Sequence, residues 1–92
     1  MSWLDRAACR GSDVDFYPEH HMDAVPALLV CARCPVVDQC RTAAALRPER
    51  FGVWGGQSEE MRGLINGGVS HRAPARAAAQ RAALAAALEM AG

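Results

Sequence analysis

The sequence predicts an all-α domain, a small bundle of about four short helices followed by an Ala-rich C-terminal helix. Apolar residues recur at helical spacing in several segments, and no segment alternates apolar and polar residues as a half-buried strand does. The last 20 residues include 11 alanines, and alanine is the strongest helix former. The length of 92 residues is enough for one small domain.

The first half of the chain is predicted to contain three short helices. A helix over residues 3–9 precedes a loop over residues 10–21, which is rich in helix breakers. Asp23 is placed to cap a second helix over residues 24–34. A proline opens the third helix, over residues 35–47, because its missing N–H costs nothing at the first helical position.

The second half begins with a glycine-rich turn. Ser58 is then placed to cap a helix over residues 59–65, which an Asn-Gly-Gly sequence ends. A long helix is predicted over residues 73–92. The chain therefore divides into a domain over residues 1–66 and an Arg- and Ala-rich, helical C-terminal segment over residues 67–92.

The hydrophobic core is expected to be thin, because Val, Ile and Leu together number only 15 residues. Small domains of this kind often depend on a bound metal or on disulfides. The N-terminus has no signal-peptide pattern, and no apolar run approaches the ~20 residues of a membrane span. We therefore expect a cytoplasmic protein without membrane contact, whose closely spaced cysteines bind metal or do redox chemistry.

Charge is unevenly distributed, although the formal net charge is zero. Residues 1–40 hold three Arg against six Asp or Glu, whereas residues 41–92 hold seven Arg against four Glu. An acidic front and a basic back are compatible with one end that faces nucleic acid.

The four cysteines carry the strongest chemical signal. Cys31, Cys34 and Cys40 lie within ten residues, and Cys9 lies upstream. Four cytosolic thiolates suit a structural zinc ion, although two Cys-x2-Cys pairs are its usual arrangement. One such pair closely followed by a third cysteine equally suits an iron–sulfur cubane. A dithiol redox site at Cys31 and Cys34 is a third alternative, without the βαβ pattern that such sites accompany.

Together with a later motif, the cysteines resemble those of the WhiB-like family of actinobacteria and their phages. The matching segments are AAC ending at Cys9, CARCPVVDQC over residues 31–40 and GVWGG over residues 52–56, within a resemblance that runs from about Trp3 to Leu64. The resemblance implies a [4Fe–4S] cluster on the four cysteines and a redox-sensing role in transcription regulation, in which nitric oxide or oxygen reacts with the cluster. It also implies docking on the C-terminal domain of the primary sigma factor of RNA polymerase.

The sigma-facing surface of the family is apolar and aromatic. By motif position it falls here on Trp3, Phe16, Tyr17, Pro18 and Trp54. Phe16 and Tyr17 lie in an acidic loop, where a core role is not evident, and aromatic side chains are common anchors of interfaces. The alternative for Trp54 is that its ring plugs its own domain. We expect a positive φ at one or more of the glycines around it.

The chain departs from the family after the GVWGG motif, where many members carry a dense basic stretch for DNA. Here the stretch offers Arg62, Arg72 and Arg76, with Arg81 further on, interrupted by glycine and proline. On a helix, Arg72 and Arg76 share a face and Arg81 lies about 140° away. Arg72, Arg76 and Arg81 suit phosphate contacts with promoter DNA better than base readout. The alternative is that they only keep an Ala-rich helix soluble.

The sequence thus predicts a transcriptional regulator rather than an enzyme. Two other functions stay open: a thiol-disulfide reductase that uses the Cys-x2-Cys dithiol of the metal-free chain, and a zinc-stabilised interaction module. His20 and His21 are expected to be exposed loop residues rather than further metal ligands.

Overall fold

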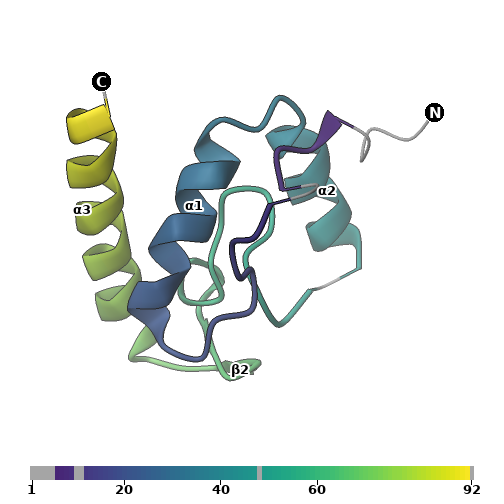
Figure 1. Ribbon diagram of the computed structural model, residues 1–92. Helices are drawn as coiled ribbons and strands as arrows, with labels where there is room; N and C mark the ends of the chain where they lie inside the picture. Colours follow the sequence, from purple (N-terminus) through teal and green to yellow (C-terminus); the bar gives the residue numbers. More distant parts are fainter. Residues whose placement is uncertain (1–5, 10–11, 48, 92) are drawn as a thin grey trace.

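The computed structural model describes residues 6–9, 12–47 and 49–91. The elements in this part of the chain are η2 (His21–Ala24), α1 (Val25–Ala32), α2 (Val37–Leu46), η3 (Glu60–Arg62), β1 (Leu64–Ile65), β2 (Gly68–Val69) and α3 (Ala73–Ala91). Helix α1 occupies the middle, with α3 on one side and α2 on the other (Figure 1). The fold is mostly helical, as predicted, but it contains a small antiparallel sheet that the sequence analysis missed.

Helix α1 starts from a 3-10 turn and not from the predicted Asp23 cap. The Nδ1 atom of His20 accepts a hydrogen bond from the N–H of Met22 at 3.2 Å and so caps η2. This turn runs directly into α1, whose N-cap residue Ala24 makes no side-chain hydrogen bond. The Asp23 prediction was wrong because this residue lies inside the turn, one residue too early to cap α1. Pro26 falls in the first turn of α1, where a proline is tolerated.

Helix α3 confirms the predicted C-terminal helix and packs beside α1. Its inner face consists of small side chains, because Ala73 and Ala77 are fully buried. Two turns after Ala77, Leu84 packs against the core. The short alanine side chains let the two helix backbones approach closely, so a helix with little apolar bulk still docks on the domain. No helix in the described ranges is long and apolar enough to cross a membrane.

One polar side chain, Gln80, is fully buried between α3 and the rest of the domain. Its Nε2 donates hydrogen bonds to the carbonyl of His21 at 2.7 Å and to Oε1 of Glu60 at 2.9 Å. Its Oε1 accepts a hydrogen bond from the Ser58 hydroxyl at 2.6 Å. Because a buried amide is costly without partners, these three bonds fix α3 to η2 and η3.

Residues 59–65 do not form the predicted helix. The Ser58 hydroxyl accepts a backbone hydrogen bond as a cap would, but only the single turn η3 follows. Gly63, at a φ of 80°, ends that turn, and β1 then pairs antiparallel with β2. Asn66 and Gly67 connect the strands with φ values of 52° and 79°, the pattern of a type I′ hairpin turn. The Asn-Gly pair that was expected to end a helix therefore joins two short strands.

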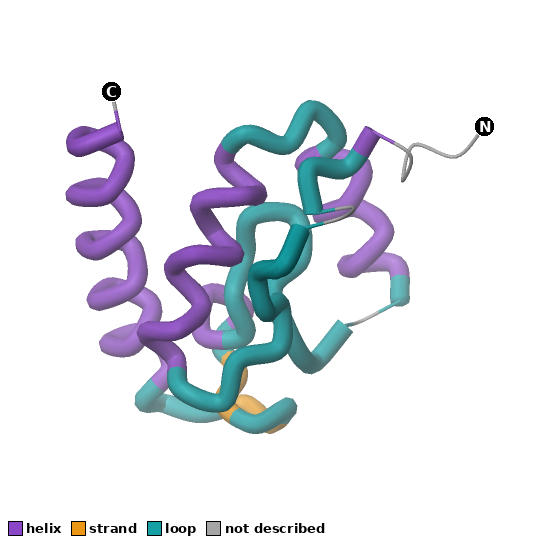
Figure 2. The backbone as a smooth tube through the Cα atoms, in the orientation of Figure 1, coloured by secondary structure: helices purple, strands orange, loops and turns teal. Residues whose placement is uncertain are grey.

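The core lies between α1 and the loops that run towards α2. Its buried residues are Ala24, Ala27, Leu28, Cys31 and Val53. Phe16 and Val37 pack against it from the loop before η2 and from the start of α2. Figure 2 shows the long loop segments that fill the space between α1 and α2. The core is as thin as predicted, and one of its members is a cysteine.

Candidate metal centre

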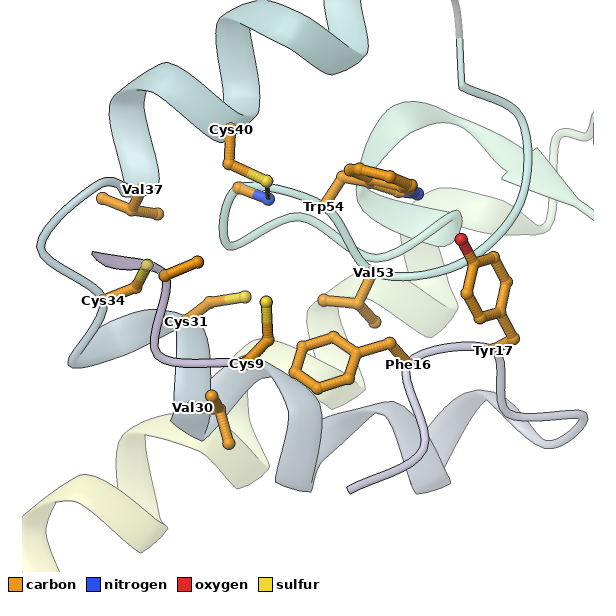
Figure 3. Close-up of a pocket in the computed structure, with 12 residues that line it drawn as sticks. Cys9, Phe16, Tyr17, Val30, Cys31, Cys34, Val37, Cys40, Val53 and Trp54 are labelled. Carbon is orange, nitrogen blue, oxygen red and sulfur yellow. Dashed lines mark hydrogen bonds between the residues drawn. The ribbon is translucent and has the colours of Figure 1, made fainter. Parts of the chain in front are cut away.

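All four cysteines line one cavity of about 260 Å³. Cys31 lies in the last turn of α1, Cys34 in the turn that follows, and Cys40 on the fourth residue of α2. Cys9 reaches the cavity from the N-terminal segment. Figure 3 shows the four side chains around the same space. The chain therefore gathers every thiol it has at one point of the fold.

Backbone hydrogen bonds explain how the three closely spaced cysteines meet. The N–H of Cys34 donates to the carbonyl of Cys31 at 3.0 Å, so the chain turns tightly at the end of α1. The N–H of Cys40 donates to the carbonyl of Val36 at 3.0 Å, at the start of α2. Pro35 lies between the two helices and prevents α1 from continuing. The Cys-x2-Cys-x5-Cys spacing thus places two helix ends around one cavity.

Backbone amides donate to three of the four sulfurs. The N–H of Gly55 donates to Sγ of Cys40 at 3.2 Å, and the N–H of Ala8 donates to Sγ of Cys34 at 3.4 Å. The N–H of Gly56 is hydrogen bonded to Cys31. Such bonds stabilise sulfur that carries negative charge, and they tune thiolates that bind metal.

The cavity by itself favours neutral thiols. Burial is the main cause that raises the pKa of Cys31, and the neighbouring cysteines raise it further. Burial also raises the pKa of Cys40, against the opposing effect of the Gly55 amide. A metal centre supplies the positive charge that allows several thiolates to share such a site.

The walls of the cavity are apolar. Val30, Val37 and Val53 line it together with aromatic side chains. Its volume of about 260 Å³ exceeds the space of a single ion, since one water occupies about 30 Å³ of the liquid. Among the residues that the structure describes, no three Cys, His, Asp or Glu side chains close on one ion position. The four sulfurs surround a space that suits a polyatomic group bound by soft thiolate ligands.

The GVWGG motif forms the turn that closes the cavity on the side of α2. Gly52, Gly55 and Gly56 have positive φ values of 80°, 55° and 79°, which confirms the predicted turn. A Cβ atom at Gly55 would overlap the backbone of Arg41, and Nε of Arg41 donates to the Gly55 carbonyl at 3.0 Å. Glycine at this position therefore lets the turn lie against α2, where its amide reaches Cys40.

Three of the predicted partner residues, Phe16, Tyr17 and Trp54, line the same cavity as the cysteines. The N–H of Val53 donates to the carbonyl of Phe16 at 2.7 Å, which joins the acidic loop to the GVWGG turn. Tyr17 is 59% exposed. Trp54 is half-buried, and its Nε1 donates to the carbonyl of Phe51 at 3.0 Å. These rings therefore form one wall that has both a buried and an exposed side.

Pro18, another predicted partner residue, does not line this cavity. Pro18 is half-buried and lines a smaller pocket beside Gly52 and Ser58. Trp3 lies outside the described residues. His20 is exposed, as expected, and stacks on His21 with ring centroids 4.6 Å apart.

The sequence analysis missed two charged side chains, Arg62 and Glu59, that hold the GVWGG turn through hydrogen bonds to its backbone. The two terminal nitrogens of Arg62 donate to the carbonyls of Gln57 and Gly52, each at 2.8 Å. The carboxylate of Glu59 accepts from the N–H of Gly52 at 3.3 Å and from that of Gly67 at 3.2 Å. Arg62 was counted with the basic stretch, but its side chain points into the fold. Its i,i+3 spacing from Glu59 was the available signal.

The three arginines predicted to contact DNA lie at or on α3. Arg72 precedes the helix and Arg81 lies along it, and both are exposed, whereas Arg76 is half-buried. Helix α3 is on the side of α1 away from α2 (Figure 1), and none of the three arginines lines the cysteine cavity. Their contact with DNA stays a prediction.

Comparison with known proteins identifies the family. The family model described as "Transcription factor WhiB" matches residues 3–65. The chain is 43% identical over 63 residues to transcriptional regulator WhiB2 of Bifidobacterium longum, which covers 67% of this chain and 64% of that protein.

Two further relatives have similar coverage. WhiB2 of Mycobacterium tuberculosis is 38% identical over 68 residues, 73% of this chain and 76% of that protein. WhiB of Streptomyces coelicolor is 40% identical over 63 residues, 67% of this chain and 72% of that protein. All three relatives are named as transcriptional regulators. The chain therefore belongs to the WhiB family of transcriptional regulators.

Proposed function

We propose that this regulator holds a [4Fe–4S] cluster on Cys9, Cys31, Cys34 and Cys40 and docks on the C-terminal domain of the primary sigma factor. The observation that supports both halves is that the cysteines and the rings of Phe16, Tyr17 and Trp54 line one cavity. A group bound to the four sulfurs would support the buried side of this aromatic wall, and the exposed side is free for a partner. Regulation of promoters would follow from the sigma contact.

The donor set supports a cluster over the two alternatives. Soft thiolates select iron–sulfur chemistry as well as zinc, but the cavity has room for a polyatomic group. A dithiol reductase needs a depressed thiol pKa, whereas burial raises the pKa of Cys31. The arrangement therefore suits ligation better than disulfide exchange.

The aromatic wall supports a protein partner. Tyr17 is 59% exposed and Phe51, next to the GVWGG motif, is 56% exposed. Exposed aromatic side chains on a rigid turn are typical anchors of protein interfaces. Trp3 and Pro18 belong to the same proposed surface by motif position. Contact of Arg72, Arg76 and Arg81 with promoter DNA is a further part of this proposal.

Redox or nitric-oxide sensing would use the same arrangement. A bound cluster supplies a centre that reacts with oxygen or nitric oxide. The chain would connect that centre to the aromatic surface. The N–H of Gly55 donates to Cys40, and two residues earlier the N–H of Val53 donates to the carbonyl of Phe16. Loss of the bound group would remove support from the aromatic wall and weaken sigma binding.

The test is anaerobic co-expression with the sigma C-terminal domain, followed by absorption spectroscopy and analysis of iron, sulfide and zinc. We expect a brown complex with about four irons per chain, which is the content of a cubane. A colourless complex with about one zinc per chain would refute the cluster and retain the sigma contact. A brown chain that does not retain the sigma domain would refute the docking and retain the cluster.

A further inference from the structure

A second concave site, here called the basic groove, lies between α2 and the segment where η3 leads into β1. It has a volume of about 360 Å³. Its charged and amide side chains are Arg41, Glu49, Arg50, Gln57 and Arg62. None of these residues lines the cysteine cavity. The groove thus brings together three guanidinium groups from α2, from the segment after it and from η3.

Two arginines of the groove, Arg41 and Arg50, keep donors for a ligand. Arg41 uses Nε on the Gly55 carbonyl, which leaves its two terminal nitrogens. Arg62 is held by two carbonyls, and its Nε is buried with no hydrogen-bond partner. Arg50 is exposed. The Nε of Arg62 has almost no accessible surface, so a ligand in the groove cannot reach it, and Arg62 contributes its positive charge and not free donors.

The charges of the groove do not cancel. Three guanidinium groups and one carboxylate, that of Glu49, line the groove, and the carboxylates of Glu59 and Glu60 act on Arg62 from outside this lining. Burial lowers the pKa of Arg62, and Glu59, Glu49 and Glu60 only partly offset this effect. An anion with several acceptor oxygens would supply both the missing charge and the missing acceptors, and the guanidinium fork matches such groups.

We propose that Arg41, Arg50 and Arg62 form a phosphate-binding groove that holds the sugar–phosphate backbone of promoter DNA. Every residue that lines the groove comes from residues 41–64, in the basic part of the chain. The predicted sigma-binding residues Phe16 and Tyr17 come from the acidic part. Trp54, the third predicted sigma-binding ring, lies within residues 41–64 but lines the cysteine cavity and not the groove, so the two surfaces can hold protein and DNA at once. The proposal deepens the proposed function and rests on it for the presence of promoter DNA.

The groove also adjoins the candidate metal centre through one residue. The carbonyl of Gly55 accepts from Arg41, and the N–H of the same Gly55 donates to Cys40. Phosphate held by Arg41 would therefore lie one residue away from the cysteine ligands. In contrast, the arginines of α3 have no such connection in the described part of the chain.

The experiment measures binding of the holo chain, alone and with the sigma domain, to a short fluorescent DNA duplex across a series of salt concentrations. Arg50→Ala is the test variant because Arg50 is exposed and supports no described hydrogen bond, so its removal should not disturb the fold. Arg6→Ala is the matched control, since it removes the same charge from an exposed position that lines neither the groove nor the cysteine cavity.

We expect Arg50→Ala to weaken binding and to reduce the slope of log affinity against log salt by about one, the effect of one lost phosphate contact. Arg50→Lys should restore most of the slope, because an ammonium group also contacts phosphate. Arg6→Ala should leave the slope unchanged. Equal slopes for Arg50→Ala and the unsubstituted chain would overturn the proposal, as would a larger loss with Arg6→Ala.

A poly-glutamate peptide serves as the competing ligand. If it binds the chain more tightly than the duplex does and Arg50→Ala weakens that binding, the groove serves acidic protein segments and the DNA assignment is wrong. Iron content and sigma retention are measured on the same samples. If the chain retains cluster and sigma domain but its DNA affinity does not change with Arg50→Ala, the groove alone is refuted. A chain without sigma binding whose DNA affinity still depends on Arg50 refutes the docking alone.

Discussion

The backbone N–H of Val53 donates to the carbonyl of Phe16 at 2.7 Å, and this bond ties two distant segments of the chain together. Phe16 belongs to the acidic loop before η2, and Val53 belongs to the GVWGG turn that contacts Cys40 through Gly55. Residues 53–55 therefore link a predicted partner residue, Phe16, to a predicted metal ligand, Cys40, through two backbone hydrogen bonds. A change at one is expected to be felt at the other.

Gly52→Ala should damage this junction. The residue has a φ of 80°, and an added Cβ would lie 2.6 Å from the Tyr17 ring and 2.8 Å from the Phe16 carbonyl. The left-handed backbone alone costs a non-glycine residue about 1–2 kcal/mol, and the clash adds to it. Chemical denaturation of the holo chain measures the loss of stability, and a pull-down measures sigma binding.

Gly63→Ala is the matched control for that change. Gly63 has the same φ of 80°, but an added Cβ meets nothing within 4 Å. It should lower the free energy of unfolding by the backbone cost only and leave sigma binding intact. If both variants lower the free energy of unfolding equally and both retain the sigma domain, the close approach of Gly52 to Tyr17 contributes neither to stability nor to sigma binding.

Trp54→Ala should abolish sigma binding while the iron content stays at the unsubstituted level. Trp54 is half-buried and anchored through Nε1 to the Phe51 carbonyl, so its ring is held in place for a partner. Truncation of an aromatic hot spot costs about 2 kcal/mol of binding or more. Trp54→Phe keeps a ring and should retain partial binding. A Trp54→Ala chain that loses its iron would instead support the alternative that the ring plugs its own domain.

Gln80→Leu should destabilise the whole fold. The substitution keeps a side chain of similar size but leaves the buried groups of Ser58, His21 and Glu60 without their partner. Each unsatisfied buried polar group costs about 1–3 kcal/mol. Urea denaturation checks the change, with Gln39→Leu as control, because Gln39 is exposed on α2 and should change stability by under about 0.5 kcal/mol. Similar losses in the two variants would contradict a role for Gln80 in docking α3.

Removal of the proposed cluster should loosen α2 before α1 and α3. Helices α1 and α3 pack on each other and on η2 and η3. The described attachments of α2 run through the cavity instead, by way of Val37, Cys40 and the bond from Arg41 to Gly55. Hydrogen exchange of the chelated chain, resolved by segment, should show faster exchange in α2 and in residues 12–17. Equal loss of protection in all three helices would contradict this division of the fold.

The sequence predicted the long helices and the gathering of the cysteines well, because both follow from local spacing. Helix α3 follows from alanine propensity, and the positions of Cys31 and Cys34 follow from Pro35, which forces a break between two helices. The positive φ of the motif glycines was predicted for the same reason, since a turn of that composition requires it.

What the sequence analysis missed depends on contacts between distant residues or on very short elements. Strands of two residues cannot show alternation, so only Asn66 and Gly67 signalled the hairpin. Arg62 looked like a solvent-exposed charge, because its carbonyl partners at Gly52 and Gln57 follow no sequence pattern. The burial of Gln80 could not be predicted from the sequence, because its three hydrogen-bond partners lie in segments distant along the chain.

Gln80 also determines how α3 is aligned along its neighbour. A helix face made of alanine is nearly uniform, so a shift by one turn would bury almost the same surface and cost little. A single amide with three partners removes that ambiguity, because every other alignment leaves it buried and unsatisfied. In this sense one glutamine supplies the register that 11 alanines cannot provide.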